Sequence, residues 1–213
     1  GEFYTPRSVV RLLVHILDPQ PGETVYDPAC GSGGMLIEAI RYMHDDSLCC
    51  GSIFGQEKNV VNAAIAKMNL FLHGASDFNV MQGDTLRDPK ILQGGNIAKF
   101  DCVIANPPFS LENWGATEWS SDKYKRNIYG TPSDSCGDYA WIQHMICSMS
   151  SGKGRMAVVM PQGILFRGNQ EAEIRKQLVE SDLIEAVVTL GDKLFYGTGL
   201  SPCFLIIRRM KPA

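Results

Sequence analysis

Short apolar segments alternate with longer amphipathic segments along this chain, and this alternation limits the folds that it can adopt. The apolar segments that we expect to form buried strands are residues 24–26, 52–55, 78–81, 101–105 and 155–160. The segments with the spacing of helices are residues 35–44, 59–73, 138–149 and 169–179. Strands that alternate with helices are typical of α/β folds with a largely parallel sheet.

The last two predicted strands, residues 183–190 and 203–208, break this alternation. The segment between them is too short for a helical crossover, so we expect the two strands to be antiparallel. At the other end of the chain, Thr5 and Pro6 predict a helix with Thr5 as its N-cap and Pro6 at its first position. We therefore expect one α/β domain over residues 1–213, with a mixed seven-stranded sheet and an antiparallel last strand.

The composition fits a cytoplasmic globular domain. The chain has 213 residues, 45% of them hydrophobic, and no apolar run approaches the ~20 residues that a membrane span needs. Its seven cysteines form no CxxC pair and its four histidines are dispersed, which predicts free thiols in a reducing compartment and no metal site. The net charge is −3, so any nucleic-acid affinity must come from a local patch or a partner. The first residue is Gly, so the sequence is expected to be a piece of a longer protein.

The segment DPACGSGG, residues 27–34, follows the first predicted strand and has the composition of a ligand-binding turn. Gly31 and Gly33 allow a tight turn and a close approach of ligand to backbone. Asp27, Glu57 and Asp84 follow or close three successive strands, where Glu57 could reach a ribose diol and Asp84 an adenine amine, and where the acids together would attract an ammonium and a sulfonium. Since the loop has no Lys, these acids favour S-adenosylmethionine over a nucleotide phosphate. A plain tight turn and solvated strand ends are the alternative interpretation.

The segment VIANPPF, residues 103–109, ends the fourth predicted strand abruptly. Asn106 offers a side-chain oxygen as acceptor, and the carbonyl of Pro107 offers a second. Pro107 and Pro108 fix the backbone, so both acceptors are held before substrate arrives. Two such acceptors can bind the two hydrogens of an exocyclic amine, while Phe109 stacks on the base. Phe195 is a candidate for the opposite face of the base, or else a core aromatic.

Residues 110–137 interrupt the alternation with a long connection, which we expect to be a mobile substrate loop. Its basic and aromatic side chains could meet DNA phosphates, or the segment could be a solvated excursion. The residues concerned are Trp119, Lys123, Tyr124, Lys125, Arg126 and Tyr129.

The motifs together resemble a known family, the modification (M) subunits of type I restriction–modification systems. These are adenine-N6 DNA methyltransferases of the γ motif order. The resemblance rests on GEFYTPR, DPACGSGG, GQEKN, GDTL and NPPF, and it continues through DYAWIQHM, MPQGILFRG, IRKQL and LFYGTG. It covers nearly all of the chain.

The resemblance implies a class I S-adenosylmethionine-dependent methyltransferase fold and site-specific methylation of a flipped adenine in double-stranded DNA. It implies cofactor-binding roles for Tyr4, Thr5, Asp27, Gly31, Gly33, Glu57 and Asp84, and catalytic roles for Asn106, Pro107, Pro108 and Phe109. It also implies flanking regions outside this chain, a specificity (S) subunit that reads the sequence, a second M subunit and a restriction (R) subunit.

Other functions remain open on the sequence. NPP-aromatic motifs also occur in methyltransferases that act on rRNA guanine or on a protein glutamine, although FYTPR and LFYGTG favour DNA. A cytosine-C5 enzyme needs a Pro-Cys nucleophile after the fourth strand, and Cys203 lies instead on the last strand. The chain alone could also be an inactive cofactor-binding module.

Overall fold

The computed structural model describes residues 5–43, 51–191, 195 and 202–210. Its helices are α1 (Arg7–Leu17), α2 (Gly34–Met43), α3 (Val60–Leu72), α4 (Ala116–Ser120), α5 (Asp138–Ser148), the 3-10 helix η1 (Gln162–Leu165) and α6 (Gln170–Glu180). Its strands are β1 (Val25–Asp27), β2 (Ile53–Glu57), β3 (Phe78–Gln82), β4 (Leu92–Gln93), β5 (Asn96–Ile97), β6 (Cys102–Ala105), β7 (Arg155–Pro161), β8 (Ile184–Thr189) and β9 (Pro202–Arg208).

Seven of these strands form one sheet in the order β3-β2-β1-β6-β7-β9-β8. The pairs from β3 to β7 are parallel, whereas β9 is antiparallel to both β7 and β8. The expected mixed seven-stranded sheet and the antiparallel final pair are thus confirmed. Each predicted strand ends within two residues of the observed one, because apolar runs mark the part of a strand that the core covers.

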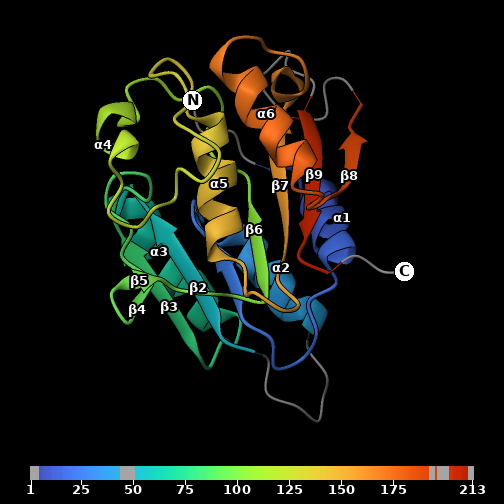
Figure 1. The fold of residues 1–213 in the computed structure, drawn as a ribbon. Coiled ribbons are helices and arrows are strands. Elements are labelled where there is room, and N and C mark those ends of the chain that lie inside the picture. The colour runs from blue at the N-terminus through green and yellow to red at the C-terminus, as the bar shows by residue number, and fades with distance from the viewer. Residues whose placement is uncertain (1–4, 44–50, 192–194, 196–201, 211–213) are drawn as a thin grey trace.

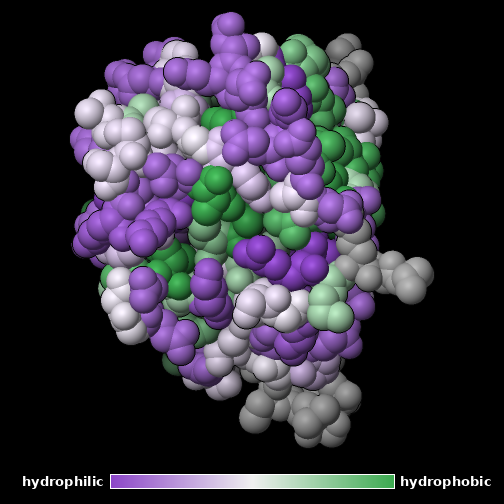
Figure 2. Space-filling model, viewed as in Figure 1, coloured by the Kyte–Doolittle hydropathy of each residue, from purple (hydrophilic) through white to green (hydrophobic). Residues whose placement is uncertain are grey.

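Helices cover both faces of the sheet, which gives three layers (Figure 1). Alternate residues of each central strand point to opposite faces: Cys102 and Ile104 of β6 pack with α1, α2 and α3, while Val103 and Ala105 pack with α5 and α6. Strand β6 is buried along its whole length, as expected for a parallel strand with helices on both sides. The face drawn in Figure 2 is mostly hydrophilic, and its hydrophobic side chains show near the edge where β8 lies and in smaller groups across the middle of the face.

Two local predictions differ from the structure. Helix α1 has Pro6 at its N-cap, with no side-chain capping bond, so the prediction that Thr5 is the cap is wrong. The Thr5 hydroxyl accepts a hydrogen bond from the Asn106 side chain instead. The sequence reading also missed a small hairpin, β4–β5, whose two-residue turn is Gly94-Gly95. Both glycines have positive φ, which a tight hairpin turn favours.

Residues 110–137 contain buried aromatic side chains and a short helix, so the segment is not a purely solvent-exposed loop. Helix α4 lies in this segment, and Trp114 and Trp119 are buried in the main cluster with their rings 5.4 Å apart. Trp114 donates from Nε1 to the Ser133 carbonyl. Aromatic burial on this scale anchors the segment to the rest of the domain.

Arg126 is buried, with 1% of its surface exposed, so the prediction that it meets DNA phosphates is wrong. Its guanidinium donates to the Asp122 carboxylate, to the carbonyls of Thr85 and Leu86, and to Nδ1 of His144. These contacts use all five guanidinium N–H groups. The sequence shows a basic residue near aromatic residues, but it does not show that all of its donors bind groups within the protein. Lys123 and Lys125 of the same segment are exposed.

No helix within the described ranges is both long enough and apolar enough to cross a membrane.

The Arg126 contacts predict a large stability effect. Arg126→Met should lower the free energy of unfolding by about 3–5 kcal/mol, because the Asp122 carboxylate and two carbonyls lose a buried partner. Lys123→Met is the matched control: this side chain is exposed, and it should change stability by at most about 0.5 kcal/mol. Urea unfolding of both variants measures the difference. Equal effects would show that Arg126 is not an anchor.

Candidate functional site

The strand ends bring the predicted site residues to one edge of the sheet. Strands β1 and β2 end at Asp27 and Glu57, Asp84 comes two residues after β3, and Asn106 directly follows β6. These four strands are parallel, so their carboxyl ends meet at the same edge. Strands β2 and β3 lie on one side of β1 and β6 lies on the other. A sheet of this type binds ligands at such a reversal of strand order.

A cavity of about 780 Å³ lies at this edge, within the usual range for small-molecule sites. It is lined by residues from both predicted halves of the site: Thr5, Asp27, Gly31, Glu57, Asp84, Asn106, Pro107, Pro108 and Phe109. Gly33 and Phe195 do not line it, and Tyr4 lies outside the described residues.

The glycine-rich loop is held by the carboxylate that ends β2. Gly31 donates its N–H to Oε2 of Glu57 at 2.9 Å, and Asn59 donates its N–H to Oε1 at 2.7 Å. Gly31 and Gly33 have φ values of +52° and +86°, a region that favours glycine. A Cβ at Gly31 would meet only open space, so the backbone there is open to a ligand.

The three acids differ in their surroundings. Asp27 is 2% exposed and accepts from the Ala29 N–H at 2.9 Å. Burial raises the pKa of its carboxyl to about 8; the Ala29 hydrogen bond lowers it in part, and the charge of Glu57 raises it further. Asp84 forms an ion pair with Lys58 at 2.9 Å. A cationic ligand would therefore stabilise the ionised form of Asp27, whereas Asp84 already has a partner.

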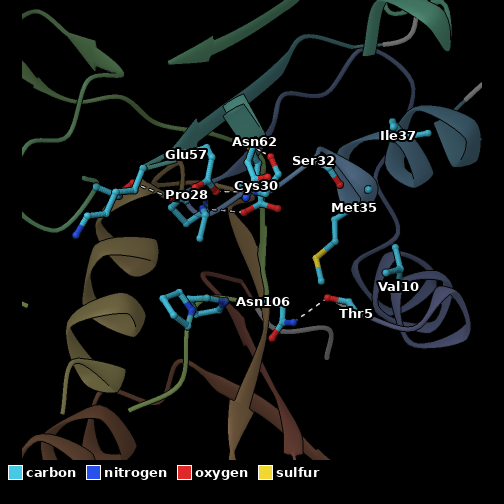
Figure 3. A pocket seen from close by; sticks show the side chains of 18 of the residues that line it. Thr5, Val10, Pro28, Cys30, Ser32, Met35, Ile37, Glu57, Asn62 and Asn106 are labelled. Atoms are coloured by element: carbon cyan, nitrogen blue, oxygen red, sulfur yellow. Dashed lines mark hydrogen bonds between the residues drawn. The ribbon is translucent and has the colours of Figure 1, made fainter. Parts of the chain in front are cut away.

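Asn106 lines the cavity and carries an unpaired acceptor. Its Nδ2 donates to the Thr5 hydroxyl at 2.7 Å, which fixes the orientation of the amide (Figure 3). Its Oδ1 is buried and has no hydrogen-bond partner within the described part of the chain. An unsatisfied buried oxygen costs about 1–3 kcal/mol. A residue that lines a cavity and carries such an unpaired oxygen is therefore a candidate for binding a ligand donor.

The residues after Asn106 are also held in place. Phe109 is half-buried and lines the cavity. The next backbone N–H, of Ser110, donates to Asp138 at 2.7 Å, and Asp138 pairs with Arg167 at 2.8 Å. Phe195 is 2% exposed within the cluster that Phe109 borders. The structure thus places Phe195 in the core, and stacking on a base would require it to leave that position.

Sequence reading missed several residues of the cavity wall. Trp141 of α5 lines the cavity, and its buried Nε1 has no partner within the described ranges. Met35 and Val10 contribute apolar surface from α2 and α1. Lys58 could have been noticed, because it directly follows Glu57. Trp141 gave no such signal, because a Trp on an apolar helix reads as core.

Comparison with known proteins gives concordant matches. The sequence profile of the family described as N-6 DNA Methylase matches residues 1–213. The type I restriction enzyme MjaVII methylase subunit of Methanocaldococcus jannaschii is 40% identical over 220 residues, which cover 100% of this chain and 37% of that protein. The chain spans 37% to 47% of the length of the curated relatives it matches.

Solved structures agree with the sequence matches. The type I restriction-modification system methyltransferase subunit from Streptococcus thermophilus superimposes with a TM-score of 0.90 at 32% identity, covering 99% of this chain and 46% of that one. A Listeria monocytogenes protein described as a class I S-adenosylmethionine-dependent methyltransferase has a TM-score of 0.77 at 17% identity, covering 98% and 62% of the two chains. The expected fold class is confirmed.

The environment of Asp27 predicts a specific pH dependence of stability. The pKa of Asp27 in the folded protein, about 8, lies above its ordinary value of 3.8, so its contribution to stability is fully present below pH 4 and is lost as the pH rises toward 8. Asp27→Asn removes the titration. The free energy of unfolding of ligand-free Asp27→Asn, relative to that of the wild type, should therefore rise between pH 4 and pH 8 by a few kcal/mol.

Urea unfolding at pH 5, 6, 7 and 8 measures this gain. Glu173→Gln is the control, because Glu173 is exposed on α6. If the curves for Asp27→Asn and wild type stay parallel over this range, the Asp27 carboxyl is ionised in the folded protein.

Proposed function

Because the chain belongs to the N-6 DNA methylase family, we propose that its cavity binds S-adenosylmethionine beside a flipped adenine and transfers the methyl group to N6. The observation that carries the proposal is the buried, unpaired Oδ1 of Asn106, a residue that lines the cavity directly after β6. The family match favours DNA adenine over the rRNA guanine and protein glutamine acceptors that the NPP-aromatic motif alone left open.

The cavity suits the cofactor in charge and shape. When bound, S-adenosylmethionine supplies an electrophilic methyl group on a sulfonium. Asp27 faces the positive part of the ligand, Glu57 accepts from the ribose diol, and Asp84 accepts from the adenine amine. Gly31 and Gly33 shape the turn beside it, and the resemblance alone assigns Tyr4, outside the described residues, to cofactor binding. These assignments follow the strand ends and the resemblance; a cationic ligand beside Asp27 would lower the raised pKa of its carboxyl and stabilise the ionised form.

The catalytic segment acts on the amine of the target base. The lone pair of that nitrogen is delocalised into the ring, so the amine is a poor nucleophile. Asn106 Oδ1 and the Pro107 carbonyl accept its two hydrogens and draw the nitrogen toward tetrahedral geometry. The nitrogen then forms a bond to the methyl carbon as the carbon–sulfur bond breaks, and the surplus proton leaves to water. Pro108 holds the backbone, and Phe109 stacks on the base.

Thr5 has a positioning role in this scheme. The resemblance implies a contact with the cofactor, but in the structure its hydroxyl accepts from Asn106 Nδ2 at 2.7 Å. This hydrogen bond fixes the amide and leaves Oδ1 of Asn106 without a partner among the described residues. Thr5 therefore aligns the acceptor before the base arrives, and Pro6 restricts its backbone to extended conformations.

The partner subunits that we propose follow from the net charge of the chain and from the resemblance. Its net charge of −3 is poorly suited to hold a DNA backbone alone. We assign sequence reading to a specificity subunit, with a second M subunit to methylate the other strand and a restriction subunit in the complete complex. Double-stranded DNA is the substrate of that assembly, and the cytoplasm is its compartment.

The role of Asn106 is tested in the full-length protein assembled with its specificity subunit. Asn106→Ala should lower the rate of methyl transfer from labelled cofactor by at least about a hundredfold, as removal of one preorganised hydrogen-bonding group does elsewhere. Calorimetry should show nearly unchanged cofactor binding. A variant that still methylates DNA would refute the assignment, and a wild-type protein that binds no cofactor would refute the proposed function as a whole.

The role of Thr5 is tested by a matched pair of substitutions. Thr5→Val keeps the shape and removes the hydroxyl, and it should lower kcat by about tenfold, the value of one hydrogen bond. Thr5→Ser restores the hydroxyl and should keep near wild-type kcat. The KM for the cofactor should stay constant in both. A raised KM with unchanged kcat would show instead that Thr5 binds the cofactor.

A further inference from the structure

Helix α3 exposes an unusual number of large apolar side chains. Its sequence, VVNAAIAKMNLFL, contains one charged residue, Lys67. Its inner face packs on the sheet through Ala63, Ala66 and Leu70. Six large apolar side chains on the remaining surface are 42% to 70% exposed: Val60, Val61, Ile65, Met68, Phe71 and Leu72. We call these six residues the α3 apolar face.

A helix that is apolar all round is normally buried on all sides. Helix α6, in the opposite layer, has the usual arrangement of a surface helix, with one apolar inner face and a polar outer face. Its inner face carries Ile174 and Leu178, and its exposed residues include Glu173, Lys176 and Glu180, with Val179 as the one exposed apolar side chain. Scattered exposed apolar residues need no explanation, but six on one helix form a patch of the kind that marks an interface.

The α3 apolar face adjoins an open edge of the sheet. Strand β3 lies beside α3 and pairs with β2 alone among the described strands (Figure 1). Its Met81 side chain is 37% exposed. An uncovered edge strand next to an apolar helix is a liability that proteins usually cover. One covering element could bury the helix face and the strand edge together.

We infer that the α3 apolar face is the docking surface for a segment of the same polypeptide outside residues 1–213. The relatives matched over the whole of this chain have more than half of their length outside the matched part. A surface as apolar as a domain core is typical of permanent contacts rather than of transient partners. A segment of the same polypeptide supplies such a contact at high effective concentration. The covering segment is expected to present an apolar helix face of its own.

Thiol labelling of the full-length protein tests this inference. Met68→Cys on α3 and Val179→Cys on α6 are matched, because the two native side chains are 58% and 59% exposed in this domain. In the folded protein, labelling at position 68 should be at least about tenfold slower than at position 179, since a covered site reacts only on local opening. Peptide mass spectrometry separates these sites from the native cysteines, and labelling in denaturant should be equal at both positions.

Three outcomes would overturn the inference. Equal labelling of the two sites in the folded protein would show that nothing covers α3. Protection at position 68 that disappears on dilution to the monomer, followed by sedimentation, would identify a second copy as the cover. Protection that arises only after a specificity subunit is added would identify that partner instead. The inference does not depend on the proposed reaction, so Asn106→Ala should leave the protection unchanged.

Discussion

The buried guanidinium of Arg126 joins the parts of this domain that the strands alone do not bring together. It binds the carbonyls of Thr85 and Leu86, just after Asp84, and it reaches His144 on α5. Burial, with the charges of Arg126 and Lys99, holds the pKa of His144 well below its usual value. The neutral ring accepts from Arg126 at Nδ1, which leaves its Nε2 proton for the Tyr26 hydroxyl of β1. One cation thus links the segment after β3 to β1 and α5.

The NPPF segment, for which we propose the catalytic role, is also held in place by a small number of hydrogen bonds. Thr5 and Asn106 are 101 residues apart in the sequence, and one hydrogen bond joins them. Asp138 holds the backbone on the other side of the NPPF motif through Ser110. The amide is thereby fixed before any ligand binds, so its orientation costs little at the moment of reaction. The remaining cost is the unpaired Oδ1, which the amine of the proposed substrate would relieve.

How much of the structure could be predicted from the sequence depends on whether the residues that interact are close or far apart along the chain. Strand and helix positions were predictable because they depend on local apolar spacing, and Asn59 caps α3 through its own side chain, as its position before the helix suggests. The carboxylates at strand ends were predictable because parallel strands share an edge. Thr5 and Arg126 were misread because each has a local role that its sequence suggests and a distant partner that overrides it. Trp141 was missed because a cavity wall and a core helix have the same composition.

The charges of the chain bear on how such a site could meet DNA. Arg155 pairs with Glu23 in the core, Arg167 with Asp138 and Glu171, and Arg126 with Asp122. Cations used in this way cannot bind phosphates, and the whole chain has 20 Lys and Arg against 23 Asp and Glu. The same domain leaves an apolar helix face open on α3. The net charge of −3 and the open apolar face of α3 agree with the two proposals, in which partner subunits hold the DNA and a further segment covers the helix, while this domain is proposed to carry out the chemistry on a single base.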